Sequence, residues 1–283
     1  MNRLLLFIIG MALSASVAAQ PHYTKADSTL VTKLLTEARS LPPTTNMPLH
    51  FARKFIGIPY VGHTLEVCDP ERLVVNTRQL DCTTLVENVV ALTLCVNSKR
   101  YCWGDFLDAL TQIRYRDGRL NGYTSRLHYF TDWIADNTRK GVVGEVQQQS
   151  APFTAVQTIN VGYMSAHPDA YKALKAHPKM VPVIKKQEEE LNGRKYRYIP
   201  KSEVKNTEAL RKAVSDGDII AITCSKAGLD IAHLGFAVWR KDGLHLLNAS
   251  QLHKKVVEEP MTLGQYLSKH PSHTGIRIIR IGK

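Results

Sequence analysis

The chain has 283 residues, a length that fits one large domain, or one domain with a sizeable insertion, and allows a real hydrophobic core. Lysine and arginine number 37 against 25 acidic residues, and the formal net charge is +12. The basic residues are scattered rather than clustered, and no internal repeat is visible. After the N-terminal segment no stretch could span a membrane, which excludes an integral membrane protein.

Residues 1–19 have the composition of a secretory signal peptide. Arg3 gives a positive start, residues 4–17 are mostly apolar, and Val17-Ala18-Ala19 ends the segment with small residues. The apolar run is shorter than the ~20 residues of a membrane span, and no cysteine follows that could carry a lipid anchor. We therefore expect cleavage after Ala19 and an exported, periplasmic monomer. Such a protein is not expected to bind nucleic acid, and its positive charge favours acidic partners.

Helical patterns dominate the first half of the chain. A helix is predicted over about 26–39, and Leu41-Pro42-Pro43 ends it. A short helix over 50–56 breaks at Gly57-Ile58-Pro59-Tyr60, and residues 60–79 are typical of a loop with short strands. Three more helices are predicted: the run after Cys82, residues 103–115, and residues 125–134 with Ser125 as the N-cap.

The second half divides into a charged middle section and a strand-rich end. Residues 140–204 have little core-forming character, so we predict an inserted or peripheral section with short helices at 168–176 and 181–191. A helix over 207–214 then leads to strands at 219–223, 233–239, 244–247 and 276–281, with Lys241-Asp242-Gly243 as a hairpin turn. The pattern predicts a single α+β domain over residues 20–283, in which a helix carrying Cys82 precedes an antiparallel sheet carrying His233.

Cys82 has the setting of a nucleophile. Asp81 is a good helix N-cap, and the apolar spacing of Leu85, Val89 and Leu92 predicts an amphipathic helix after it. Cys82 would then lie in the first turn, where free N–H groups and partial positive charge favour a thiolate. A buried structural thiol is the alternative.

His233 opens a predicted strand and is the expected base for Cys82. Asn248 ends the next strand, across the hairpin, where it could fix the imidazole tautomer. A plain strand-end asparagine is the alternative for Asn248. His245 is the rival orienting group, but by strand alternation it shares the side of Leu247.

The remaining cysteines and histidines give weaker signals. Five cysteines are an odd number for an oxidising compartment, so one must stay free or pair between chains, and we assign Cys82 as the free one. Cys95 and Cys102 could close a short bridge, but the pairing of the other four, Cys68, Cys95, Cys102 and Cys224, is left open. His270-Pro271-Ser272-His273 contains a helix-breaking proline, and no other histidines have ligand spacing, so neither a metal nor a cofactor is expected.

The motifs resemble the NlpC-type superfamily of papain-like cell-wall cysteine hydrolases. Asp81-Cys82-Thr83, His233-Leu234-Gly235-Phe236-Ala237 and Leu247-Asn248-Ala249-Ser250 carry this resemblance, and Tyr60 resembles a tyrosine that lies beside the nucleophile. The chain is more closely similar to the N-acetylmuramoyl-L-alanine amidase-like branch. The segments that indicate the branch are residues 58–60, 80–87, 123–130, 198–201 and 228–230.

The resemblance implies a papain-like catalytic domain that hydrolyses the amide between the lactyl group of N-acetylmuramic acid and L-alanine in peptidoglycan fragments or muropeptides. Cys82, His233 and Asn248 would be catalytic, with Tyr60 and the Cys82 N–H, held by Asp81, at the oxyanion. Expected substrate contacts are Ser125, Arg126, Tyr129, Trp133 and Tyr198. The aromatic residues could instead be the buried stripe of a helix.

Two other functions fit the same residues. An endopeptidase that cuts between D-glutamate and the diamino acid would share the triad and differ only in pocket shape. A non-catalytic wall-binding protein could keep the fold, but binding alone needs none of Cys82, His233 and Asn248.

Overall fold

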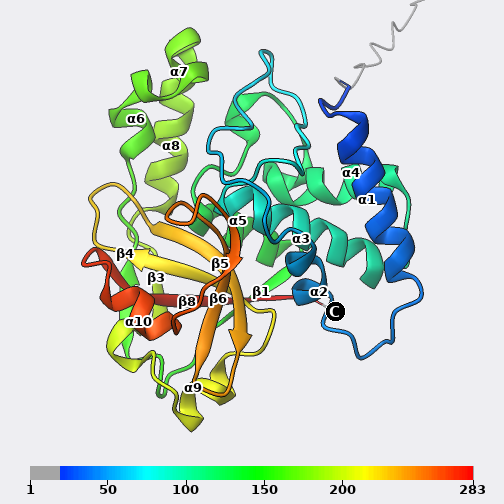
Figure 1. The fold of residues 1–283 in the computed structure, drawn as a ribbon. Helices are drawn as coiled ribbons and strands as arrows, with labels where there is room; N and C mark the ends of the chain where they lie inside the picture. The colour runs from blue at the N-terminus through cyan, green and yellow to red at the C-terminus, as the bar shows by residue number, and fades with distance from the viewer. Residues whose placement is uncertain (1–19, 283) are drawn as a thin grey trace, which may run out of the picture.

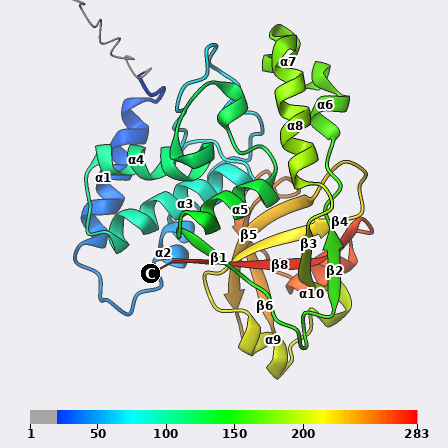
Figure 2. The ribbon, with the colours of Figure 1, turned by 180° about the vertical axis from the view of Figure 1, so that it is seen from behind.

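A computed structural model describes residues 20–282, and the predicted signal peptide, residues 1–19, lies outside them. The described chain has an α+β fold in which N-terminal helices pack against one eight-stranded antiparallel sheet (Figures 1 and 2). This confirms the predicted fold class at the level of architecture. Within residues 20–282 no helix is long and apolar enough to cross a bilayer.

The helices of the first half surround α3, which carries Cys82. This helix is apolar on nearly all sides, a pattern typical of a fully buried helix, and α1, α2, α4 and strand β5 pack around it. The bounds in this half are α1 (Lys25–Ala38), α2 (Met47–Lys54), α3 (Cys82–Asn97), α4 (Trp103–Arg114) and α5 (Phe130–Arg139).

The sheet lies beside this helical layer, and its strands run in the order β2-β3-β8-β4-β5-β6-β7, with β1 also pairing with β8. β5 and β6, which carry His233 and Asn248, are antiparallel neighbours, with Phe236 opposite Leu247. The strands are β1 (Val143–Val146), β2 (Ala155–Thr158), β3 (Lys195–Pro200), β4 (Ile219–Cys224), β5 (Ile231–Trp239), β6 (Leu244–Ser250), β7 (Lys255–Glu258) and β8 (His273–Ile281).

The section expected to be inserted or peripheral divides into two parts. Strands β1, β2 and β3 belong to the sheet, because β1 and β3 both pair with β8. Only the helices between β2 and β3 project from the body (Figures 1 and 2), and they bury a small core of their own that includes Met164, Leu174 and Ile184. These helices are α6 (Tyr163–Ala166), α7 (Lys172–Ala176) and α8 (Val181–Leu191).

The structure corrects the helix predicted over 125–134. Residues 123–125 form a 3₁₀ turn and the chain is then extended, because Tyr115 and Arg126 form a β-bridge and the Leu127 N–H donates to the Arg114 carbonyl at 2.9 Å. α5 therefore begins only at Phe130. Strand β7 and helix α10 (Leu263–Ser268) were not among the predicted elements. The other short elements are α9 (Glu208–Ala213), η1 (Arg116–Gly118), η2 (Tyr123–Ser125), η3 (Pro168–Ala170), η4 (Pro178–Met180) and η5 (Lys201–Glu203).

Gly235 allows β5 and β6 to approach closely beside His233. A Cβ atom at this position would lie 2.6 Å from the Leu247 carbonyl oxygen and 2.8 Å from a methyl carbon of Leu246. Real Cβ atoms essentially never make such contacts. The glycine of the His233-Leu234-Gly235 motif is therefore required by the packing of the two strands that carry the candidate base and its neighbour.

We expect Gly235→Ala to lower the free energy of unfolding by about 1–3 kcal/mol, because the added methyl overpacks the strand pair. Gly144→Ala in β1 is the matched control, since no atom lies within 4 Å of a Cβ there. Urea unfolding curves of the two variants and the wild type measure the effect. Equal unfolding midpoints for both variants would contradict the close-approach argument.

Candidate active site

Cys82 is fixed at the start of α3 by a reciprocal cap. The Asp81 carboxylate accepts from the Thr84 N–H at 2.8 Å, and the Thr84 hydroxyl accepts from the Asp81 N–H at 2.9 Å. This capping box satisfies two backbone donors and fixes the entry of the chain into the helix. The backbone N–H of Leu234 on β5 lies near enough to the Cys82 thiol to lower its pKa. The helix start therefore lies beside the strand that carries His233.

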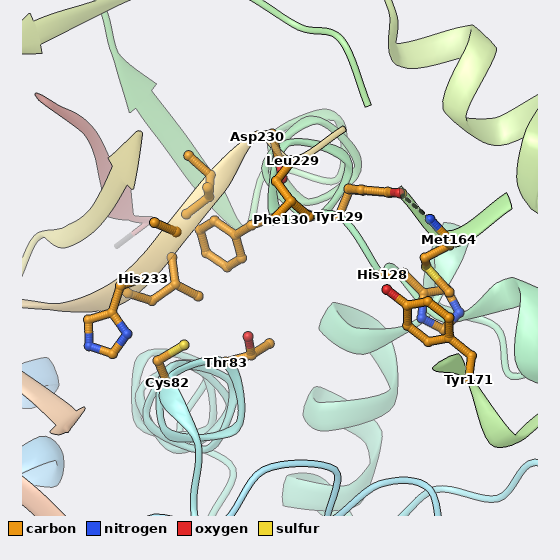
Figure 3. A pocket seen from close by; sticks show the side chains of 13 residues that line it. Cys82, Thr83, His128, Tyr129, Phe130, Met164, Tyr171, Leu229, Asp230 and His233 are labelled. Carbon is orange, nitrogen blue, oxygen red and sulfur yellow. Dashed lines mark hydrogen bonds between the residues drawn. The ribbon is translucent and has the colours of Figure 1, made fainter. Parts of the chain in front are cut away.

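His233 and Asn248 form the hydrogen bond that the sequence predicted. The His233 Nε2–H donates to Asn248 Oδ1 at 2.9 Å, and Asn248 is fully buried. Nδ1 is thus left for the thiol, and Figure 3 shows the Cys82 sulfur near the His233 ring at one edge of a shared cavity. The rival residue His245 bonds instead to the Glu259 carbonyl and to Asp242.

The environment favours a neutral thiol and a neutral imidazole at rest. Burial, followed by the nearby Asp81 carboxylate, raises the pKa of the Cys82 thiol to about 12. Burial also lowers the pKa of His233, against the hydrogen bond to Asn248, which raises it. This differs from the thiolate expected at a helix N-terminus, because desolvation disfavours the charged form of each group. Cys82 therefore needs His233 as a general base to become a nucleophile.

Tyr60 lies near Cys82. Burial, followed by the proximity of Cys82 and Asp81, raises the pKa of the Tyr60 phenol to about 12. The backbone of Tyr60 is held by a bridge to Leu80 and by an N–H bond to the Lys254 carbonyl at 2.9 Å. The phenol stays protonated at neutral pH and can donate a hydrogen bond beside the thiol.

The cavity next to Cys82 and His233 has a volume of about 180 Å³ (Figure 3). This is smaller than the roughly 300–1,000 Å³ that encloses a drug-sized ligand, so it would hold one unit of a larger molecule. Its lining combines apolar and aromatic side chains with polar ones, and neither lysine nor arginine is part of it. The lining residues are Cys82, Thr83, His128, Tyr129, Phe130, Met164, Tyr171, Leu229, Asp230, Ile231, Ala232, His233 and Leu234.

Asp230 is the acidic residue of this lining. It is 4% exposed, and one carboxylate oxygen accepts from the Thr131 N–H at 2.7 Å. His128 does not offset its charge, because burial lowers the pKa of that imidazole to about 3. Asp230 is therefore a fixed carboxylate in the cavity lining, held by the Thr131 N–H.

The expected substrate contacts divide between the cavity and the protein interior. Tyr129 borders the cavity, but its hydroxyl donates to Glu188 at 2.7 Å, so its place is set by the projecting helices. Trp133 is fully buried in the main core, as the alternative of a buried helix stripe requires. Tyr198 lies on β3, opposite Ala155, and does not line the cavity.

The side chains of Arg126 and Ser125 also form hydrogen bonds with other residues of the protein. Arg126 is 5% exposed, and its guanidinium forms ion pairs with Glu66 at 2.5 Å and with Glu71 at 3.5 Å. The guanidinium is therefore already paired inside the protein, and the expected ion pair with a substrate carboxylate is not supported. The Ser125 hydroxyl accepts from the Asn121 N–H and donates to the Gly122 carbonyl. Neither residue lines the cavity.

Sequence reasoning missed the part of the cavity that the middle section supplies. Met164 lies on α6 and Tyr171 directly precedes α7, and no local pattern distinguishes either residue from its neighbours. Asp230 had a signal, because it ends the Gly228-Leu229-Asp230 segment of the family resemblance, but no role was given to it. All five cysteines lie in the described chain and have free thiols, Cys95 and Cys102 included. Residues 20–282 contain no group of three or more His, Cys, Asp or Glu residues able to hold a metal ion.

Comparisons with known proteins agree on one family. The family described as N-acetylmuramoyl-L-alanine amidase-like matches residues 50–276. The crystal structure of an N-acetylmuramoyl-L-alanine amidase from Bacteroides uniformis is 42% identical, covers 84% of this chain and 98% of its own, and superposes with a TM-score of 0.78. No match was found among curated proteins.

Two further structures resemble the chain. A protein from Bacteroides fragilis whose name suggests a xylanase is 42% identical, covers 82% of this chain and all of its own, and has a TM-score of 0.76. A Legionella pneumophila protein is 23% identical over 90% of this chain and 94% of its own, with a TM-score of 0.69, and supports the fold alone.

The raised pKa of Cys82 predicts slow alkylation of this thiol at neutral pH. The thiolate is the reactive form, so the iodoacetamide rate at Cys82 should still be rising above the ordinary thiol pKa of 9.0. Mass spectrometry of the peptide containing Cys82 measures the rate, with the peptide of the exposed Cys102 as an internal reference. A fast rate that does not change between pH 5 and 8 would instead indicate a preformed thiolate–imidazolium pair.

Proposed function

The chain belongs to the N-acetylmuramoyl-L-alanine amidase-like family, and we propose that it is an exported cysteine hydrolase of peptidoglycan fragments. The bond cleaved is the amide between the lactyl group of N-acetylmuramic acid and L-alanine. One observation carries the proposal: Cys82 and His233 border the same cavity, and His233 is hydrogen bonded to Asn248.

The arrangement supports a finer assignment to the NlpC-type, papain-like superfamily. A cysteine begins a helix that packs on an antiparallel sheet, a histidine lies on one strand, and the next strand supplies the orienting amide. A wall-binding protein without catalysis would not need these three groups to converge. Their convergence therefore favours an enzyme over the binding alternative.

The reaction begins with proton transfer from the Cys82 thiol to His233 Nδ1. The sulfur attacks the lactyl carbonyl carbon, and the oxyanion receives hydrogen bonds from the Cys82 N–H and the Tyr60 hydroxyl. When the carbon–nitrogen bond breaks, the His233 imidazolium protonates the leaving alanine nitrogen. The muramoyl group remains on Cys82 as a thioester.

Hydrolysis of the thioester restores the enzyme. Neutral His233 takes a proton from water, and the hydroxide attacks the thioester carbonyl. The carbon–sulfur bond breaks, the muramic acid leaves with a free carboxyl group, and the imidazolium returns its proton to the sulfur. Asn248 holds the same ring nitrogen throughout both halves of the reaction.

The cavity lining favours a sugar over an acidic peptide beside Cys82. Stem peptides carry the carboxylate of D-glutamate, and the lining offers no lysine or arginine to neutralise it. Aromatic faces at Phe130 and Tyr171 suit the apolar side of a sugar, and the Asp230 carboxylate suits its hydroxyl and amide donors.

The endopeptidase remains the second candidate because of Asp230. The buried Asp230 carboxylate in the cavity lining could also pair with the free ammonium group of a stem peptide that begins with L-alanine. A xylanase, as the name of the Bacteroides fragilis relative suggests, would need two carboxyl groups flanking the scissile bond. The lining contains one, Asp230.

We also propose where the protein acts and in which oligomeric state. The composition of residues 1–19 supports secretion to the periplasm without a lipid anchor, where muropeptides are available as partners. We propose that the protein acts there as a monomer, without metal or cofactor.

A muropeptide that retains its muramic acid should yield the free sugar acid and an intact peptide that begins with L-alanine. The same peptide without the sugar should not be cut, because the group that fills the cavity is missing. Mass spectrometry of the products after incubation with the purified protein measures both.

Cys82→Ala and His233→Ala are the controls, and each should lose turnover while the fold is retained, since both side chains are only half-buried. Cleavage of the sugar-free peptide after D-glutamate would replace the amidase assignment by the endopeptidase. Full turnover by a folded Cys82→Ala variant would exclude the thiol mechanism.

A further inference from the structure

Glu259 is a fully buried carboxylate beneath the candidate catalytic pair. We propose that Glu259 is a positioning residue: it fixes the orientation of the Asn248 amide and thereby selects the His233 tautomer that can accept the Cys82 proton. The inference rests on the proposed roles of Cys82 and His233 and adds a fourth member to their hydrogen-bond chain.

The contacts form one continuous line from the cavity into the protein. His233 Nε2 bonds to Asn248 Oδ1 at 2.9 Å, and Asn248 Nδ2 donates to Glu259 Oε1 at 3.1 Å. The other carboxylate oxygen, Oε2, bonds to His253 Nε2 at 3.1 Å. Asn248 and Glu259 are both 0% exposed, so water does not compete for these bonds.

The backbone of Glu259 is held as firmly as its side chain. It directly follows β7, its N–H donates to the Leu246 carbonyl at 2.8 Å, and its carbonyl accepts from His245 Nδ1 at 2.9 Å. His245 is itself fully buried and bonds to Asp242. The position of the carboxylate relative to β6 is therefore set by the sheet and not by a mobile loop.

The Glu259 carboxylate oxygen accepts from Asn248 Nδ2, and this acceptor role sets the direction of every hydrogen bond in the chain of contacts. Because Glu259 accepts, the NH₂ group of Asn248 must face it, and the Asn248 oxygen must face His233. That oxygen also only accepts, so His233 carries its proton on Nε2. Nδ1 is then the unprotonated nitrogen on the side of Cys82.

Without the carboxylate, only the long hydrogen bond from Asn248 Nδ2 to the Leu246 carbonyl, at 3.5 Å, favours this orientation. A flipped Asn248 would present its NH₂ group to His233, and the neutral ring would carry its proton on Nδ1. That tautomer cannot accept the thiol proton. The charge of Glu259 acts in the same sense, since it raises the pKa of His233 against the dominant effect of burial.

The test measures the tautomer of His233 directly by ¹H–¹⁵N NMR of the full-length mature protein, with the His233 signals identified from a His233→Gln variant. The wild type at neutral pH should show the Nε2–H tautomer. Glu259→Gln keeps the size of the side chain but offers either an oxygen or an NH₂ group to Asn248. It should therefore give a mixture of both tautomers.

Glu258→Gln is the matched control, because this neighbouring acid bonds to Arg240 and Arg53 and does not touch Asn248. It should leave the tautomer unchanged, whereas Asn248→Ala should remove the selection completely. Glu259→Gln should add nothing in the Asn248→Ala background, since the effect passes through that amide.

Activity gives a second readout. Glu259→Gln should lower kcat about 10-fold, in the range typical of groups that orient a functional histidine, with KM little changed. An Nδ1–H tautomer in the wild type would overturn the proposal, and so would a single Nε2–H tautomer in folded Glu259→Gln. Because the NMR measurement needs no substrate, failure of the amidase assignment would leave this result intact and distinguishable.

Discussion

The packing of α3 against β5 and β6 is the constraint on which the site depends. Leu85, Val86 and Val89 of the helix are fully buried in the same core as Phe236 and Leu247 of the two strands. Burial of such a side chain contributes about 1.5–3 kcal/mol, so separation of the helix from the sheet would cost much of the stability of the domain. The distance between the thiol and the imidazole is thus set by the core of the protein, and the site is organised before a substrate binds.

The projecting helices α6, α7 and α8 extend this site beyond the core that holds the triad residues. The Tyr129 hydroxyl accepts from the Met164 N–H at 3.1 Å and donates to Glu188, which ties the cavity wall to α8. A change in these helices would alter the pocket without moving Cys82 or His233. The cavity walls are therefore built partly from segments of the chain that do not carry Cys82 or His233.

The features that were predictable from sequence are those with a local cause. Asp81 as a cap, the helix after it and the pairing of β5 with β6 through a short turn follow from patterns within about ten residues, and the structure confirms them. The bond between His233 and Asn248 followed from the hairpin register. The role of each group as catalytic stays a prediction until activity is measured.

The features that were not predictable depend on partners distant in sequence. Arg126 has the appearance of a free cation in the sequence, but Glu66, 60 residues away, accepts its hydrogen bond inside the fold. Glu259 directly follows the short strand β7, in a segment without a motif, and only the fold places it under Asn248. Helix α5 begins at Phe130 and not at Ser125, because Arg126 forms a β-bridge with Tyr115 and the residues before Phe130 are therefore extended.

Cys82 is proposed to form a thioester with the muramoyl group, and hydroxylamine can intercept that thioester. A defined muropeptide would be incubated with the protein and increasing hydroxylamine, and the products identified by mass spectrometry. We expect muramoyl hydroxamate to replace the free sugar acid in proportion to the hydroxylamine present, and Cys82→Ala to form none. A peptidyl hydroxamate, or release of free acid alone at every hydroxylamine concentration, would contradict this proposal.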